Sequence, residues 1–112
     1  DDHSLTVGKY VTVGHGAVIH ACQIADECLI GMNSTILDGA RIGKQSIVAA
    51  GSLVPAGMKV PAGSLVAGVP AKIKRKLSED ERKKLKGWAE KYLVVAKAHR
   101  EKLGERRPGP PA

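Results

Sequence analysis

The fold is decided by residues 24–66, which read IADECLIGMNSTILDGARIGKQSIVAAGSLVPAGMKVPAGSLV. An aliphatic residue returns every six positions, and the residue four places after it is mostly small. The aliphatic positions are Ile24, Ile30, Ile36, Ile42, Val48, Val54, Val60 and Val66. Such a six-residue period is typical of a hexapeptide β-helix, in which each repeat supplies one short strand and one corner.

The period also predicts how the core is stacked. Three hexapeptides form one triangular coil, so aliphatic residues that are three repeats apart should lie above one another. The predicted columns are Ile24, Ile42 and Val60 in one, and Ile30, Val48 and Val66 in another. Upstream, Val7, Val13 and Ile19 continue the series, with one residue dropped before Ile24. Such thin aliphatic layers need no aromatic side chains, and the chain contains no Phe.

After Pro70 the pattern changes to that of a helix. Ser78 and Glu81 form a capping box, and the acidic first turn suits the helix dipole. Apolar residues then follow at helical spacing, at Leu85, Trp88, Ala89, Tyr92 and Ala96. We expect a helix over residues 79–102 whose apolar stripe packs on the β-helix of the same or a neighbouring chain, with Gly104 as C-cap. Trp88 and Tyr92 are interpreted as docking residues, with a ligand groove as the alternative.

The formal charge of +7 is concentrated in the C-terminal part of the chain. Residues 1–70 carry four basic and five acidic residues, a net charge of −1, whereas residues 71–112 carry fourteen and six, a net charge of +8. This basic segment lacks interleaved aromatic residues, so we expect a solvated helix face and no nucleic-acid partner. Because no apolar run approaches the roughly 18 to 20 residues of a membrane span, we also expect no membrane partner.

Two histidines stand out in residues 13–22, which read VGHGAVIHAC. His15 and His20 are five positions apart, so in one extended strand they would point to opposite faces. They would also lie about 16 Å apart, at roughly 3.3 Å per residue. A metal ion bound by both would therefore need further partners from elsewhere, and surface histidines without a site are the alternative interpretation.

The sequence resembles the C-terminal part of the γ-class carbonic anhydrase-like family, over residues 5–103. These proteins are left-handed β-helices of the hexapeptide-transferase superfamily. The resemblance runs through LTVGKYVTVGHGAVIHACQI at residues 5–24, CLIGMNSTILDGARIG at 28–43, AAGSLVPAGMKVP at 49–61 and AGVPAK at 67–72. Its most specific part is GHGAVIHAC, because His15 and His20 stand where the family carries two of its three metal-binding histidines.

The resemblance implies an all-β solenoid, a left-handed parallel β-helix followed by a C-terminal α-helix. We expect three to four coils in residues 1–75, the helix in 76–104, where it packs on the β-helix, and a disordered tail in 105–112. The resemblance also implies a homotrimer that hydrates CO2 reversibly to bicarbonate, a lyase activity. The metal would be zinc, with Fe²⁺ or Co²⁺ as alternatives, bound by His15 and His20 at subunit interfaces. Zinc lowers the pKa of a bound water to about 7, which gives hydroxide for attack on CO2.

The third metal ligand and the proton-transfer residues of the family fall upstream of Asp1. We therefore expect part of the active site to lie outside this chain, with His3 as an alternative third ligand, and we assign no catalytic residue. Two other functions stay open. One is acyl transfer from acyl-CoA with a histidine as general base, and the other is a metal-binding scaffold without activity.

Three further residues receive structural interpretations. Cys22 and Cys28 fall on adjacent faces of a coil and are expected to be reduced core thiols of a cytoplasmic protein, with zinc ligands or a disulfide as the alternatives. Asp38, followed by Gly39, is interpreted as part of a turn.

Overall fold

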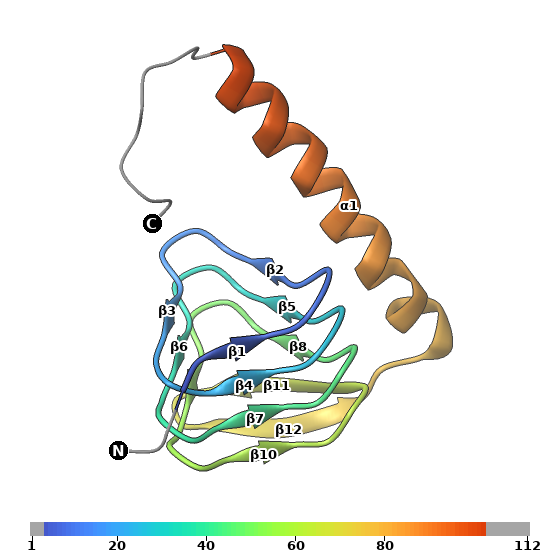
Figure 1. Cartoon of the computed structure of the whole chain (residues 1–112). Coiled ribbons are helices and arrows are strands. Elements are labelled where there is room, and N and C mark those ends of the chain that lie inside the picture. The colour runs from blue at the N-terminus through green and yellow to red at the C-terminus, as the bar shows by residue number, and fades with distance from the viewer. Residues whose placement is uncertain (1–3, 103–112) are drawn as a thin grey trace.

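The computed structural model describes residues 4–102, and its side chains are described for residues 4–91. It consists of short strands followed by one long helix (Figure 1). The strands are β1 (Thr6–Val7), β2 (Thr12–Val13), β3 (Val18–Ile19), β4 (Gln23–Ile24), β5 (Leu29–Ile30), β6 (Thr35–Ile36), β7 (Arg41–Ile42), β8 (Ile47–Val48), β9 (Leu53–Val54), β10 (Lys59–Val60), β11 (Ser64–Gly68) and β12 (Ala71–Lys76), and the helix is α1 (Glu79–Lys102).

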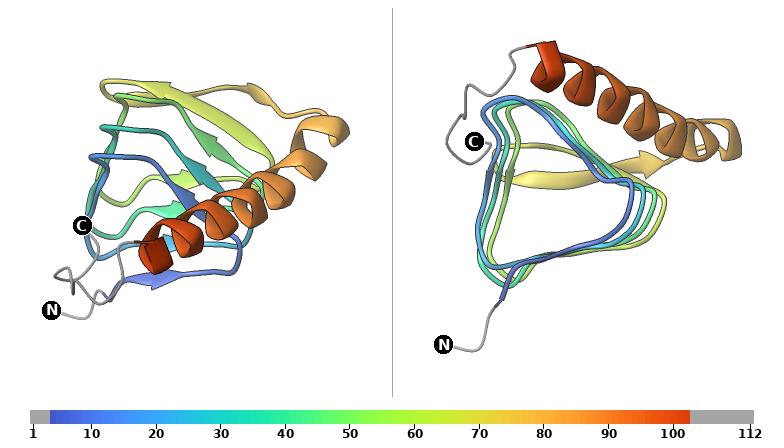
Figure 2. Two further views of the ribbon diagram at one scale, coloured as in Figure 1. Left: turned by 90° about the horizontal axis from the view of Figure 1, so that it is seen from above. Right: turned by 45° about the horizontal axis from the view of Figure 1, so that its top comes forward.

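Every third strand lies on the same side of a triangular coil (Figure 2). Sheet A has the order β1-β4-β7-β10, sheet B the order β12-β11-β8-β5-β2, and sheet C the order β3-β6-β9. Neighbouring strands of successive coils are parallel, so that Gln23 pairs with Arg41 of the next coil and Arg41 pairs with Lys59 of the coil after it. The predicted fold class, a left-handed parallel β-helix with a C-terminal helix, is confirmed.

The core is a stack of branched aliphatic side chains inside the triangle. The second residue of each short strand points inward, and the predicted columns form as expected, since Ile24 pairs with Ile42 and Ile30 pairs with Val48. From Ile24 to Val66 these residues are at most 4% exposed. Small residues at the corners complete the core, and the buried Ser34 and Ser64 donate their hydroxyl protons to backbone carbonyls at 2.6 and 2.7 Å.

One corner is one residue short of the six-residue repeat. Most corners have four residues, with the third in the left-handed conformation, as at Gly16 (φ 74°) and Asn33 (φ 58°). Between β3 and β4 only His20, Ala21 and Cys22 intervene. A coil that includes this corner is accordingly one residue shorter, which is why Val18 pairs with Thr35 rather than with Ile36. The residue that the sequence pattern drops before Ile24 is missing from this corner.

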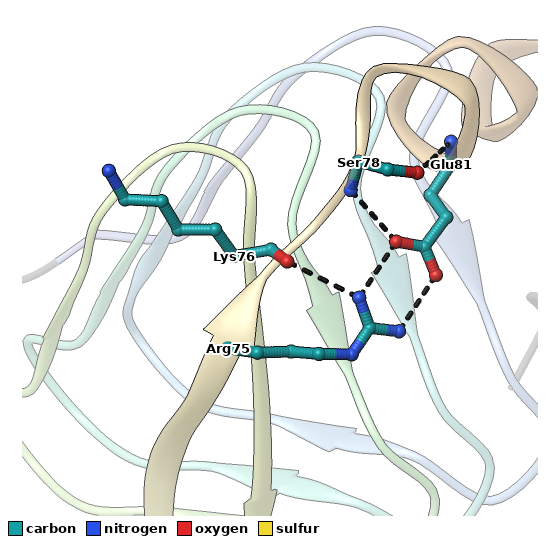
Figure 3. Close-up of polar contacts among 4 residues, drawn as sticks. All are labelled: Arg75, Lys76, Ser78 and Glu81. Carbon is teal, nitrogen blue, oxygen red and sulfur yellow. Dashed lines mark hydrogen bonds and ion pairs between the residues drawn. The ribbon is translucent and has the colours of Figure 1, made fainter.

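The end of the solenoid is closed by a strand that the six-residue pattern does not predict. Strand β12 pairs antiparallel with β11, and its residues from Lys72 to Lys76 are exposed. Helix α1 follows at once and begins with the predicted capping box, because Ser78 Oγ accepts the amide of Glu81 at 3.1 Å and Glu81 Oε1 accepts the amide of Ser78 at 2.8 Å. Arg75 also donates two hydrogen bonds of 2.8 Å to the Glu81 carboxylate (Figure 3).

Helix α1 packs over sheet B and buries only part of its expected stripe. Leu85 and Ala89 are 2% and 4% exposed, and the ammonium of Lys86 lies 4.8 Å above the ring of Tyr10. Trp88, expected to dock on the same or a neighbouring chain, is 43% exposed in the single chain. The side chains of residues 92 and 96 and the expected tail at 105–112 lie outside the described part. Within residues 4–102, no helix is both long and apolar enough to cross a membrane.

Candidate functional site

The outward surfaces of the three sheets differ in chemistry. The first residue of each short strand points outward. The outward rows are Thr6, Gln23, Arg41 and Lys59 on sheet A, Thr12, Leu29, Ile47 and Leu65 on sheet B, and Val18, Thr35 and Leu53 on sheet C. The row on sheet B lies beneath helix α1. We call the outward surface of sheet C face C, and it carries no charged residue in its row.

The corners between the sheets also differ in the number of charged residues that they carry. The corners between sheets A and B hold most of the charged side chains of the coils, at Lys9, Asp26, Glu27 and Lys44. Within residues 4–66, the corners on the two sides of face C carry a single formally charged residue, Asp38, beside His15 and His20. Face C is therefore an uncharged surface with histidines at its margins. Helix α1 runs along another side of the triangular coil (Figure 2).

His15 lies at one edge of face C, in the corner between β2 and β3. Its side chain is exposed, and its carbonyl accepts a hydrogen bond of 2.9 Å from the amide of Asn33 in the next coil. A groove of about 720 Å³ runs beside it, between the coils and Ala89 of α1. The groove wall is mainly apolar and includes Val11, Met32 and Ala50. A ligand in this groove would lie next to the imidazole of His15.

His20 lies at the opposite edge of face C, in the short corner. Its amide donates to the carbonyl of Ile36 at 2.9 Å, which fixes the backbone on the next coil. Its Nδ1 is 3.8 Å from Oδ1 of Asp38, and the two side chains are 47% and 55% exposed. The same Oδ1 accepts the amide of Ala21 at 3.3 Å. Sequence reasoning interpreted Asp38 only as part of a turn, although the stacking of coils places it beside the corner of His20.

A single chain does not bring His15 and His20 together. They occupy the two edges of one face, and among the described residues no three His, Cys, Asp or Glu side chains form a cluster that could hold a metal ion. The suggested third ligand His3 lies outside the described residues. The donor chemistry nonetheless fits zinc, because both imidazoles are exposed and imidazole is a common zinc ligand.

Cys22 and Cys28 are inward-facing thiols. Both are 1% exposed and neither forms a disulfide. Burial raises the pKa of the Cys28 thiol to about 11, although backbone hydrogen bonds from Ser46 and Gln45 act in the opposite direction. Burial also raises the pKa of Cys22. These two residues are core thiols, since metal binding favours an accessible thiolate.

Comparison with known proteins gives concordant results. Residues 21–56 match the family "Bacterial transferase hexapeptide (six repeats)". The chain is 43% identical over 93 residues to "Gamma carbonic anhydrase 2, mitochondrial" of Arabidopsis thaliana, an alignment that covers 83% of this chain and 34% of that protein. It is 47% identical over 90 residues to "Probable carbonic anhydrase" of Methanocaldococcus jannaschii, covering 80% and 57%.

A solved structure extends the similarity to the fold. A hexapeptide transferase family protein from Anaplasma phagocytophilum superimposes with a TM-score of 0.76 and 35% identity, over 84% of this chain and 61% of that one. This chain thus spans between about a third and three fifths of these proteins. The repeats, the coil geometry and these similarities agree, and the chain belongs to the γ-carbonic anhydrase-like hexapeptide superfamily.

Proposed function

We propose that the protein catalyses the reversible hydration of CO2 at zinc sites shared between the subunits of a homotrimer. The relatives named carbonic anhydrase support this activity. The observation that carries the proposal is the placement of His15 and His20 at opposite edges of face C. An uncharged face with a metal-binding side chain at each edge suits an assembly in which each edge meets a different neighbour.

The proposed assembly follows from this placement. If three copies turn face C toward a common threefold axis, the His15 edge of one copy meets the His20 edge of the next, and the contact repeats around the ring. Each interface then holds one His15 and one His20 from different chains. The outward row of Val18, Thr35 and Leu53 would be buried near the axis without placing a charge there. The family resemblance implies a third ligand upstream of Asp1, with His3 as the alternative.

In the proposed reaction the metal activates water, and the chain holds the ion and provides the surface for CO2. Bound zinc lowers the pKa of a water molecule to about 7 and so supplies a nucleophile for CO2 at neutral pH. Two neutral imidazoles hold the ion without cancelling its charge, which keeps it a strong Lewis acid. The apolar surface beside them, including the half-exposed Val18, suits an uncharged and weakly hydrated substrate such as CO2.

Acyl transfer is the second candidate function. The groove of about 720 Å³ beside His15 supports it, because a histidine next to a long apolar groove could act as general base toward an acceptor hydroxyl or amine. The superposition on a hexapeptide transferase family protein also supports it. In that function one histidine is sufficient, and zinc has no role. The third alternative is an assembly that binds metal without catalysing a reaction.

The shared site can be tested by mixing variants of the intact protein. His15→Ala and His20→Ala each remove one ligand from every interface, so neither variant alone should retain zinc. In trimers refolded from an equal mixture, about one quarter of the interfaces should combine an intact His15 with an intact His20 of the neighbour. We expect these mixtures to recover about one quarter of the zinc and of the CO2 hydration rate of the wild type.

The alternatives give different results in the same experiment. A wild-type protein that binds zinc without hydrating CO2 would favour the third alternative, an assembly that binds metal without catalysing a reaction. Activity with acyl-CoA that depends on His15 alone and persists after zinc removal would favour acyl transfer. Mixtures that contain no more zinc than the single variants would contradict a site shared between chains.

We also propose that the protein works in a reducing compartment such as the cytoplasm. The support is the state of Cys22 and Cys28, which are free and buried although they belong to consecutive repeats.

A further inference from the structure

We propose that Asp38 is a positioning residue that holds the Nδ1 side of His20 and leaves Nε2 free to bind the metal. This inference rests on the proposed function, in which His20 is a zinc ligand. It adds a residue that lies one coil away from the ligand and that donates nothing to the metal itself.

The geometry begins with the short corner. His20, Ala21 and Cys22 form this corner, which stacks on the four-residue corner that contains Asp38. Backbone hydrogen bonds join the two corners, since Gly39 donates its amide to the carbonyl of Ala21 at 2.8 Å. The Asp38 carboxylate reaches across and accepts the amide of Ala21 at 3.3 Å. The carboxylate is thus fixed to the same corner that carries His20.

The imidazole of His20 turns its Nδ1 toward this carboxylate. The distance from Nδ1 to Oδ1 is 3.8 Å. In the proposed contact the ring would turn about its Cβ–Cγ bond, a torsion with a broad energy well, to bring Nδ1 closer to the carboxylate. A carboxylate that accepts the Nδ1 proton fixes the tautomer and the orientation of the ring. Both side chains are about half exposed, so Nε2 remains accessible to an ion at the edge of face C.

The repeat provides a matched control in Asp26. Its carboxylate occupies the same position in the corner between β4 and β5 and accepts the amide of Lys9 in the preceding coil at 2.9 Å. The residue before Lys9 is Gly8, whereas the residue before Ala21 is His20. Removal of the Asp26 carboxylate therefore measures how much such a corner hydrogen bond contributes to the stability of the fold, without an effect on a metal ligand.

The experiment compares Asp38→Ala with Asp26→Ala in the intact protein. Long-range ¹H–¹⁵N spectra of the metal-free protein report which nitrogen of His20 carries the proton, and competition with a chelator gives the zinc affinity. We expect the wild type and Asp26→Ala to hold the proton of His20 on Nδ1, and Asp38→Ala to move it to Nε2. Zinc affinity should fall about 10- to 100-fold in Asp38→Ala and stay at the wild-type value in Asp26→Ala.

A conservative variant separates the effect of the charge from that of the corner hydrogen bond. Asp38→Asn keeps an oxygen that accepts the amide of Ala21. Its unfolding midpoint should therefore equal that of the wild type, whereas its zinc affinity should be reduced as in Asp38→Ala. An unchanged His20 tautomer in Asp38→Ala, or equal losses of zinc affinity in Asp38→Ala and Asp26→Ala, would overturn the positioning role. A wild type without zinc would contradict the proposed function alone, since the tautomer still reports the contact with Asp38.

Discussion

Sheets A and C share one backbone design and differ in what they show to solvent. Both are built from parallel two-residue strands, and both place Ile or Val against the same core. Outward, sheet A shows Gln23, Arg41 and Lys59, whereas face C shows Val18, Thr35 and Leu53. The charged corners lie between sheets A and B, and the histidines lie at the edges of face C.

This difference shows that the inward row is selected for packing in the core, whereas the outward row is selected for contact with solvent or with another chain. The inward residues must fill a coil of fixed size, so they are interchangeable between faces. The outward residues contribute little to the coil and are free to specify solvent contact on one side and association on another. Two experiments test that separation, and two more test a buried corner and the start of the helix over sheet B. They are arranged from the largest expected effect to the smallest.

The largest effect is expected from a charge in the inward row behind face C. Ile36 is fully buried, so Ile36→Asp should destabilise the fold by several kcal/mol, because a carboxyl group would lose its hydration without gaining a partner. Chemical unfolding followed by circular dichroism measures this loss. Lys44→Asp, at an exposed corner between sheets A and B, is the control and should leave the unfolding midpoint almost unchanged. Equal midpoints would contradict the inward assignment.

A charge in the outward row of face C should affect assembly rather than folding. Thr35→Arg would place three like charges around the proposed threefold axis, and like-charge juxtaposition at an interface costs several kcal/mol. We expect a monomer by light scattering at concentrations where the wild type is trimeric. Gln23→Arg makes the same kind of change on sheet A and should leave the trimer intact. Trimers in both variants would show that face C is not the interface.

The buried thiols behind the corners should react slowly. Because the pKa of Cys28 is raised to about 11 from an ordinary value of 9.0, its thiolate fraction at pH 8 is about 100-fold smaller than that of an ordinary thiol. Alkylation of the native protein should be slower by at least that factor, and urea should restore ordinary rates. The raised pKa also means that the stability linked to the protonated thiol is present below pH 9 and is lost as the pH rises toward 11. Rapid alkylation of the native protein would contradict the burial.

The smallest effect concerns the start of the helix over sheet B. The Arg75 guanidinium, assisted by the amide of Ser78, lowers the pKa of Glu81 to about 2. A lowered carboxyl pKa stabilises the folded state above the ordinary value of 4.5, and this contribution disappears as the pH falls toward 2. NMR titration of the Glu81 carboxyl should give a midpoint near 2, and Arg75→Ala should move it upward. A midpoint that Arg75→Ala leaves unchanged would show that the ion pair of Figure 3 does not form in solution.

Most of the fold was predictable because it is periodic. The six-residue recurrence predicts the inward residues and the columns, since a triangular coil of three repeats leaves one way to stack Ile24 on Ile42. Strand β12 was not predictable by the same argument, because it pairs antiparallel with its own neighbour and needs no hexapeptide. Docking of Trp88 stays a prediction, because helical spacing defines a stripe without showing which chain covers it, and Trp88 is 43% exposed in the single chain.

The candidate site was predictable only in part. The sequence singles out His15 and His20 through a family resemblance, and their role as ligands stays a prediction. It did not indicate Asp38, because the contact with His20 depends on a corner that is one residue short and on a carboxylate that reaches across to the preceding coil. Such a contact depends on the stacking of coils, which a local motif does not encode.

The three-residue corner formed by His20, Ala21 and Cys22 also bears on how such a chain can change its length. Loss of a residue within a strand would turn every following side chain to the other face, whereas here the loss falls between strands and Gln23 still pairs in step with Arg41. This corner therefore absorbs the missing residue without disturbing the core. We expect such a solenoid to tolerate changes of length at the corners, which also carry its candidate functional side chains. A change in a corner can then alter a site while the packing of the core stays the same.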